Sequence, residues 1–206
     1  MNINLSFRQL STGALLGVLL TVPGFAQHQP PGAPQPAVAA SPYAPYEFLM
    51  GDWDVMQPDK PPFMVMHFKW GGGPRGYIFY NASMLKDGAE ETHFEGMLIW
   101  NAVSKNLDML LTLDPTHGET QERGTVYITS DGTVVRQIQA IGPQSVRGPD
   151  GKPTAGSAIF RQTFKQTGPD EIKTVVLRDT LNGWVPTFPG SENLIMKRRA
   201  PAGHTR

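Results

Sequence analysis

Hydrophobic and polar residues alternate with a period of two along most of the chain beyond residue 46. Short runs rich in β-branched and aromatic residues are separated by turn-forming residues at intervals of about 8 to 15 residues, which is typical of all-β domains. The pattern predicts strands at 52–57, 63–70, 77–83, 92–101, 105–113, 124–129, 133–141, 158–166, 171–179 and 193–199. The Asp87-Gly88 and Asp131-Gly132 pairs favour tight hairpins between neighbouring strands. A single turn around 45–50 is the only helical candidate.

This order of elements predicts an all-β fold. Sequential strands with short connections, and without helices to cover a sheet, are best satisfied by an antiparallel up-and-down β-barrel of about 8 to 10 strands, because closure removes exposed edges. A two-sheet β-sandwich is the alternative.

The first 26 residues have the pattern of a secretion signal peptide. Arg8 supplies a positive charge, residues 14–22 form an apolar run, and small residues at 24 and 26 suit cleavage before Gln27. The apolar run is shorter than the roughly 20 residues that a transmembrane helix needs, so no integral membrane segment is predicted. We therefore expect a periplasmic or secreted protein. The chain has no cysteine and forms no disulfide there.

Residues 27–45 contain six of the 19 prolines and no charged residue, which predicts an extended, disordered linker. The expected folded domain is 46–199, followed by a disordered tail at 200–206. Without the signal peptide the chain keeps 17 basic and 18 acidic residues. This balance gives no reason to expect nucleic acid or an anionic membrane as a partner, since both require a basic surface. We expect a monomer or a weak dimer.

The stretch Gly51-Asp52-Trp53, preceded by a helical turn and opening the first strand, resembles the start of calycin barrels. The order of further motifs is similar to that of exported bacterial lipocalin-like domains of unknown function: Trp70-Gly71, Gly96 to Trp100-Asn101, Gly183-Trp184 and a basic last strand. The resemblance implies that Trp53 closes one end of the barrel under a basic residue of that last strand. Alternation of Leu194, Met196 and Arg198 on one face favours Arg198.

The second predicted strand offers a candidate ligand-binding face. Its alternation places Met64, Met66, Phe68 and Trp70 on one side. Methionine and aromatic side chains suit a cavity for a flexible hydrophobic ligand, and Trp100 is assigned to the same lining. The alternative is that these residues only fill the core of the barrel.

Several later strands are polar on both faces, which predicts a partly polar lumen. Buried polar groups need partners such as water or a ligand head group. Arg136 and Arg161 are therefore candidates for holding a carboxylate, by analogy with fatty-acid-binding barrels. The alternative is that both arginines lie on the outer surface.

Catalytic motifs are absent: the chain lacks a Gly-x-Ser-x-Gly elbow, a cysteine nucleophile and a His-Glu-x-x-His helix. His93 and Glu95 are expected on one face of the fourth strand, as a general base and its orienting partner or as a surface pair. His93 is also assigned to the ligand site.

The sequence offers ligands for two kinds of metal site. Met64, Met66 and His67, completed by His93, offer soft ligands for Cu(I), although alternation sends His67 to the opposite face. The only late histidine available to haem is His204. No cofactor is predicted. The sequence thus favours an exported protein that binds a hydrophobic or amphipathic small molecule; the alternatives are a copper- or haem-binding barrel and an interaction domain without a ligand.

Overall fold

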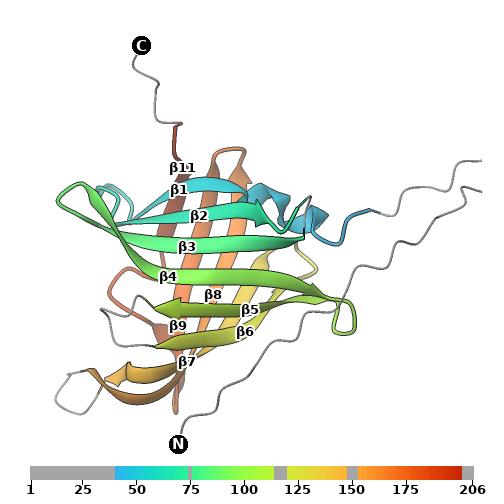
Figure 1. The fold of residues 1–206 in the computed structure, drawn as a ribbon. Coiled ribbons are helices and arrows are strands. Elements are labelled where there is room, and N and C mark those ends of the chain that lie inside the picture. Colours follow the sequence, from blue (N-terminus) through green and yellow to red (C-terminus); the bar gives the residue numbers. More distant parts are fainter. Residues whose placement is uncertain (1–39, 74–75, 114–119, 148–152, 201–206) are drawn as a thin grey trace, which may run out of the picture. The chain divides into compact units, whose positions relative to one another are not determined.

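The computed structural model describes residues 40–73, 76–113, 120–147 and 153–200 (Figure 1). The predicted signal peptide at 1–26, most of the predicted linker, nearly all of the tail and His204 lie outside these residues. Their assignments stay predictions.

The described residues form one short 3-10 helix followed by antiparallel strands. The elements are η1 (Ala44–Leu49), β1 (Gly51–Met56), β2 (Met64–Gly71), β3 (Tyr77–Lys86), β4 (Ala89–Asn101), β5 (Asn106–Leu113), β6 (Gln121–Ile128), β7 (Val134–Arg147), β8 (Pro153–Gly168), β9 (Glu171–Thr180), β10 (Gly183–Pro186) and β11 (Leu194–Arg198).

The strands close into an up-and-down barrel. The sheet runs in the order β9-β11-β1-β2-β3-β4-β5-β6-β7-β8, and β8 pairs back onto β9 to complete a ring of ten strands. Figure 1 shows β8, β9 and β11 crossing behind β1 to β5. The predicted all-β, up-and-down barrel is confirmed, and the sandwich alternative is wrong. Within the described residues, no helix has the length and hydropathy of a membrane span.

All ten predicted strands are present, but β10 was not predicted. It continues the hairpin that leaves β9, with Gly183 opposite Thr180 and Trp184 opposite Asp179. Gly183 has a positive φ of 98°, as a tight turn at this point requires. The Gly-Trp pair therefore starts a short strand. This strand was not predicted because its four residues are too few to show an alternating pattern.

The core is formed by the side chains that alternate into the lumen. Trp53, Phe68, Tyr80 and Phe164 are among the most deeply buried, and they come from β1, β2, β3 and β8. Residues far apart in sequence therefore share one interior, whose burial supplies most of the stabilisation of the fold.

Helix η1 covers one end of the barrel, here named the η1 end. The Tyr43 hydroxyl accepts a hydrogen bond from the Trp100 amide (2.9 Å) and donates to the Gly76 carbonyl (3.0 Å). The Tyr46 hydroxyl donates to the Val126 carbonyl at 3.3 Å, and burial raises the pKa of Tyr46 to about 12. Tyr43, at the end of the predicted linker, is therefore buried against the barrel.

Two glycines allow the wall to bend. A Cβ at Gly96 would lie 2.0 Å from the Leu110 carbonyl oxygen, and one at Gly124 would lie 2.0 Å from that of Gln137. Only glycine permits such a close approach of neighbouring backbones, which a tightly curved barrel wall demands.

Candidate functional site

The η1 end contains the predicted contact between Trp53 and Arg198. The guanidinium carbon of Arg198 lies 4.2 Å from the centroid of the Trp53 ring. Arg198 also donates to the Met50 carbonyl at 2.8 Å and to the Asp170 carboxylate at 2.9 Å. The Trp53 indole donates to the Leu49 carbonyl at 2.7 Å. Every polar group in these contacts has a partner, so this end of the barrel is a structural seal.

Gly51 is part of the same seal. Its φ is +119°, and an added Cβ would lie 2.5 Å from a guanidinium nitrogen of Arg198. Both the backbone conformation and the available space therefore require glycine at this position.

The predicted face of β2 points into the barrel. Phe68 packs against Tyr80, with ring centroids 5.0 Å apart, and meets Phe164 edge-on at 6.2 Å. Met66 is buried, while Met64 is only partly buried. These residues form the apolar part of the lumen.

Trp70 and Trp100 lie at the η1 end. The Trp70 ring meets the Tyr43 ring edge-on at 5.5 Å, and Trp100 is bonded to the Tyr43 hydroxyl through its backbone amide. Both tryptophans are partly buried against the core and line the end that η1 covers.

His67 does not point towards the methionines of β2. His67 lies on the face opposite Met64 and Met66, where its Nδ1 is 2.7 Å from the Asp52 carboxylate and its Nε2 is 2.9 Å from that of Glu90. Among the described residues, no group of three or more histidine, aspartate or glutamate side chains is arranged to hold a metal ion.

His93 lies at an irregularity in the barrel wall. Phe94 pairs with Ala82 and Thr92 pairs with Ser83, which makes His93 the extra residue of a β-bulge. The regular alternation that predicted a shared face for His93 and Glu95 is therefore interrupted at this point. The His93 ring lies 4.4 Å from the Phe94 ring, centroid to centroid.

The two candidate arginines lie on opposite faces of the wall. Arg136 pairs with Gln162, and Gln137 pairs with Arg161, so alternation that turns Arg136 inward turns Arg161 outward. Arg161 stacks on the Trp184 ring at 4.2 Å and donates to the Gln137 side chain at 3.3 Å. The structure thus places Arg161 on the outer surface, which is the alternative left open from the sequence, and turns only Arg136 of the two towards the lumen.

A cluster of polar side chains is buried inside the barrel, here named the lumen cluster. It comprises Tyr80 from β3, Glu122 from β6, Arg136 from β7, Gln162 from β8 and Thr174 from β9, none of them more than 8% exposed. The guanidinium carbon of Arg136 lies 5.3 Å from the centroid of the Tyr80 ring. Five strands therefore converge on one polar region.

Several polar atoms of the lumen cluster have no hydrogen-bond partner within the described chain. They are Nε and Nη1 of Arg136, Oε2 of Glu122 and Oε1 of Gln162. Gln162 does donate to the Thr174 hydroxyl at 3.1 Å. Leaving buried polar groups without partners costs free energy, so native proteins supply water or ligands to such groups.

The charges of the lumen cluster are not balanced by an ion pair. No salt bridge joins Arg136 and Glu122 in the part of the chain that the structure describes. Burial raises the pKa of the Glu122 carboxyl, and the nearby Arg136 charge opposes this shift only in part. Burial also raises the pKa of the Tyr80 phenol. Both effects favour neutral side chains around a charged guanidinium.

Sequence reasoning missed Tyr80, Glu122, Gln162 and Thr174. Gln162 alternates with Phe160 and Phe164 along its strand, and this pattern would have predicted that its side chain points inward. Glu122 was missed because the sixth strand was predicted to begin at residue 124, whereas β6 begins at Gln121.

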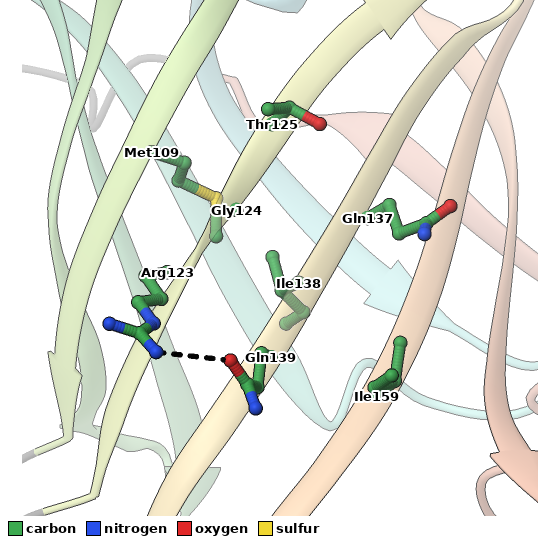
Figure 2. A pocket seen from close by; sticks show the side chains of 8 residues that line it. All are labelled: Met109, Arg123, Gly124, Thr125, Gln137, Ile138, Gln139 and Ile159. Atoms are coloured by element: carbon green, nitrogen blue, oxygen red, sulfur yellow. Dashed lines mark hydrogen bonds between the residues drawn. The ribbon is translucent and has the colours of Figure 1, made fainter.

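A separate groove of about 550 Å³ lies on the outer wall formed by β5 to β8 (Figure 2). Figure 2 shows Arg123 bonded to Gln139, at 3.3 Å, and Gln139 also donates to the Ser157 hydroxyl at 2.8 Å. Arg123 and Gln139 of the groove thus have hydrogen-bond partners, whereas both Nε and Nη1 of Arg136 in the lumen cluster have none in the described chain. The lining residues are Met109, Arg123, Gly124, Thr125, Gln137, Ile138, Gln139 and Ile159.

A comparison of the chain with protein-family models and with curated proteins found no match. The geometry of the lumen is therefore the basis for a functional assignment.

Proposed function

We propose that the barrel binds a small amphipathic molecule whose anionic head group contacts Arg136 in the lumen. The observation that carries this proposal is the buried guanidinium of Arg136, two of whose nitrogen atoms have no partner within the described chain. Guanidinium N–H groups donate short, charge-assisted hydrogen bonds to the oxygens of a carboxylate, phosphate or sulfonate, which supports an oxyanion as a partner for the free nitrogens of Arg136.

The charge of the lumen also favours an anion. A buried cation is costly unless an opposite charge lies close by. Glu122 forms no ion pair with Arg136, and its raised pKa favours the neutral carboxyl. A bound anion would therefore supply the missing countercharge.

The apolar part of the ligand would contact the hydrophobic lining. Phe68 and Phe164 lie in ring contact, and Phe68 also packs on Tyr80, whose ring carries the Arg136 guanidinium. Apolar and charged surfaces thus adjoin within the lumen. Burial of each methylene group of a ligand contributes about 0.8 kcal/mol, so a short alkyl chain adds substantial affinity.

The predicted signal peptide and the resemblance to exported calycin barrels support a carrier or sensor outside the cytoplasm. In this proposal the protein has no enzymatic activity and needs no cofactor. The structural seal at the η1 end would close one end of the ligand site.

The proposal is tested by titrating the protein with decanesulfonate, a singly charged oxyanion with a ten-carbon chain, while tryptophan fluorescence is recorded. Arg136→Met preserves the volume and removes the charge. We expect it to weaken binding by about tenfold or more, the factor that corresponds to about 1.4 kcal/mol of a charge-assisted hydrogen bond.

Arg161→Met is the matched control, since it removes an arginine from the outer face of the same wall. It should leave the affinity for decanesulfonate unchanged. Equal affinities of the wild type and Arg136→Met, or absence of binding to the wild type, would contradict the proposal. A titration with 1-decanol, which has the same chain and no charge, isolates the contribution of the head group.

A further inference from the structure

We propose that the lumen takes up its anionic ligand together with one proton, which is held on Glu122, so that the affinity for a singly charged oxyanion falls as the pH rises. This inference rests on the proposed function of the same lumen. It assigns Glu122 a role that the binding of an anion by Arg136 alone does not require.

Glu122 is placed to hold a proton. It is only 4% exposed, and its Oε2 atom has no hydrogen-bond partner in the described chain. Its cross-strand neighbours are Leu111 on β5 and Ala140 on β7, both apolar. A carboxylate in this setting lacks the donors that would stabilise its charge, whereas a neutral carboxyl can itself donate one hydrogen bond.

A gap along the strands separates Glu122 from Arg136. Arg136 pairs with Val126, which lies four residues beyond Glu122 on β6. The two backbone positions are therefore offset by about 13 Å along the strand. Their side chains influence each other electrostatically without forming an ion pair, so a change of charge beside Arg136 alters the environment of Glu122.

Two further titratable groups of the lumen, Tyr80 and Arg178, do not replace Arg136 as the main charge that acts on Glu122. Tyr80, from β3, interacts electrostatically with Glu122, but burial keeps its phenol neutral by raising its pKa. From β9, Arg178 occupies the lumen-facing position opposite Phe160, and its Nε has no partner in the described chain. Arg136 is the charge that most favours ionisation of Glu122.

Binding of an anion changes the balance at Glu122. The anion neutralises the attraction of Arg136 and adds a negative charge near the carboxyl, and both effects disfavour the carboxylate. The pKa of Glu122, already raised by burial, then rises further in the complex. A protein that was ionised at Glu122 must take a proton from the solvent when the ligand binds.

The sign of the pH dependence follows from this linkage. Below the pKa of the free protein, Glu122 is protonated with or without ligand, and the affinity is constant. Between the pKa of the free protein and that of the complex, the affinity falls by up to about tenfold for each pH unit, because one proton accompanies each ligand.

The test is isothermal titration calorimetry with decanesulfonate from about pH 5 to about pH 9, because the sulfonate stays ionised over this range and does not titrate itself. Repeating the titration in buffers with different ionisation enthalpies measures the number of protons taken up. We expect an uptake that approaches one proton per ligand in the wild type, together with a falling affinity. Glu122→Gln should bind with constant affinity and take up no proton.

Binding without proton uptake in the wild type would overturn the inference and leave the proposed function intact. An identical pH profile in Glu122→Gln would do the same. Absence of binding even at the acidic end of the range would overturn the proposed function, and the inference with it. The measurement on the wild type needs no variant to fold.

Discussion

Arg198 and Arg136 both stack on aromatic rings, yet their surroundings differ. Arg198, at the η1 end, has the Trp53 ring, the Met50 carbonyl and the Asp170 carboxylate as partners. Arg136, in the lumen, has the Tyr80 ring, while its Nε and Nη1 have no partner in the described chain. The first arrangement is complete without a ligand, and the second is not.

The difference separates structural from functional polar residues. A guanidinium that is hydrogen-bonded to the chain at the rim stabilises the fold, whereas a buried one whose nitrogens lack partners lowers its stability. Proteins retain such destabilising groups where function needs them. The two arginines should therefore respond in opposite ways when they are replaced.

The largest expected effect concerns the seal itself. Trp53 is completely buried, and Trp53→Ala should lower the free energy of unfolding by about 3 to 5 kcal/mol, through lost burial and the cavity that remains. Urea denaturation measures the change. Trp184→Ala, which removes a partly exposed tryptophan from the outer face, should cost less. A loss below about 1 kcal/mol for Trp53→Ala would show that the η1 end is not a seal.

A smaller effect is expected at Arg198. Arg198→Met keeps an apolar contact with Trp53 but loses the hydrogen bonds to Met50 and Asp170 and the cation–π contact. Stability should fall by about 2 kcal/mol, reduced by solvent screening at this partly exposed site. The same chemical denaturation measures it. An unchanged denaturation midpoint in Arg198→Met would show that Arg198 does not stabilise the fold and so does not differ from Arg136 in this respect.

A third effect is confined to the pH dependence of stability. Because the pKa of Glu122 is raised in the folded state, ionisation of this group disfavours folding. The wild type should lose stability, relative to Glu122→Gln, as the pH rises from the ordinary value of 4.5 through the raised pKa. Denaturation of both proteins at several pH values gives the difference. If the stabilities of the two proteins changed with pH in the same way, the pKa of Glu122 would not be raised in the folded state.

The barrel could be predicted from sequence because it depends on local alternation, which turns every second side chain of Met64 to Trp70 inward. The seal by Trp53 was implied by the resemblance to calycin barrels. Alternation of Leu194, Met196 and Arg198 then selected Arg198 as its partner.

The polar site could be predicted only in part, because it depends on how neighbouring strands are aligned. Arg136 and Arg161 each lie in a strand that is polar on both faces, and only the pairing of Gln137 with Arg161 shows that they point in opposite directions. At His93 the bulge breaks the period. Glu122 fell between two predicted strands, in a loop where a carboxylate is expected to face the solvent.

In our proposal, Arg136 is retained for a ligand and not for the fold. This is tested by comparing Arg136→Met with the wild type in two assays on the same preparations, urea denaturation without ligand and titration with decanesulfonate. We expect the free energy of unfolding to be unchanged or to rise by about 1 kcal/mol, while binding weakens by about tenfold or more. A loss of stability together with undiminished binding would contradict it and would make Arg136 a structural residue like Arg198.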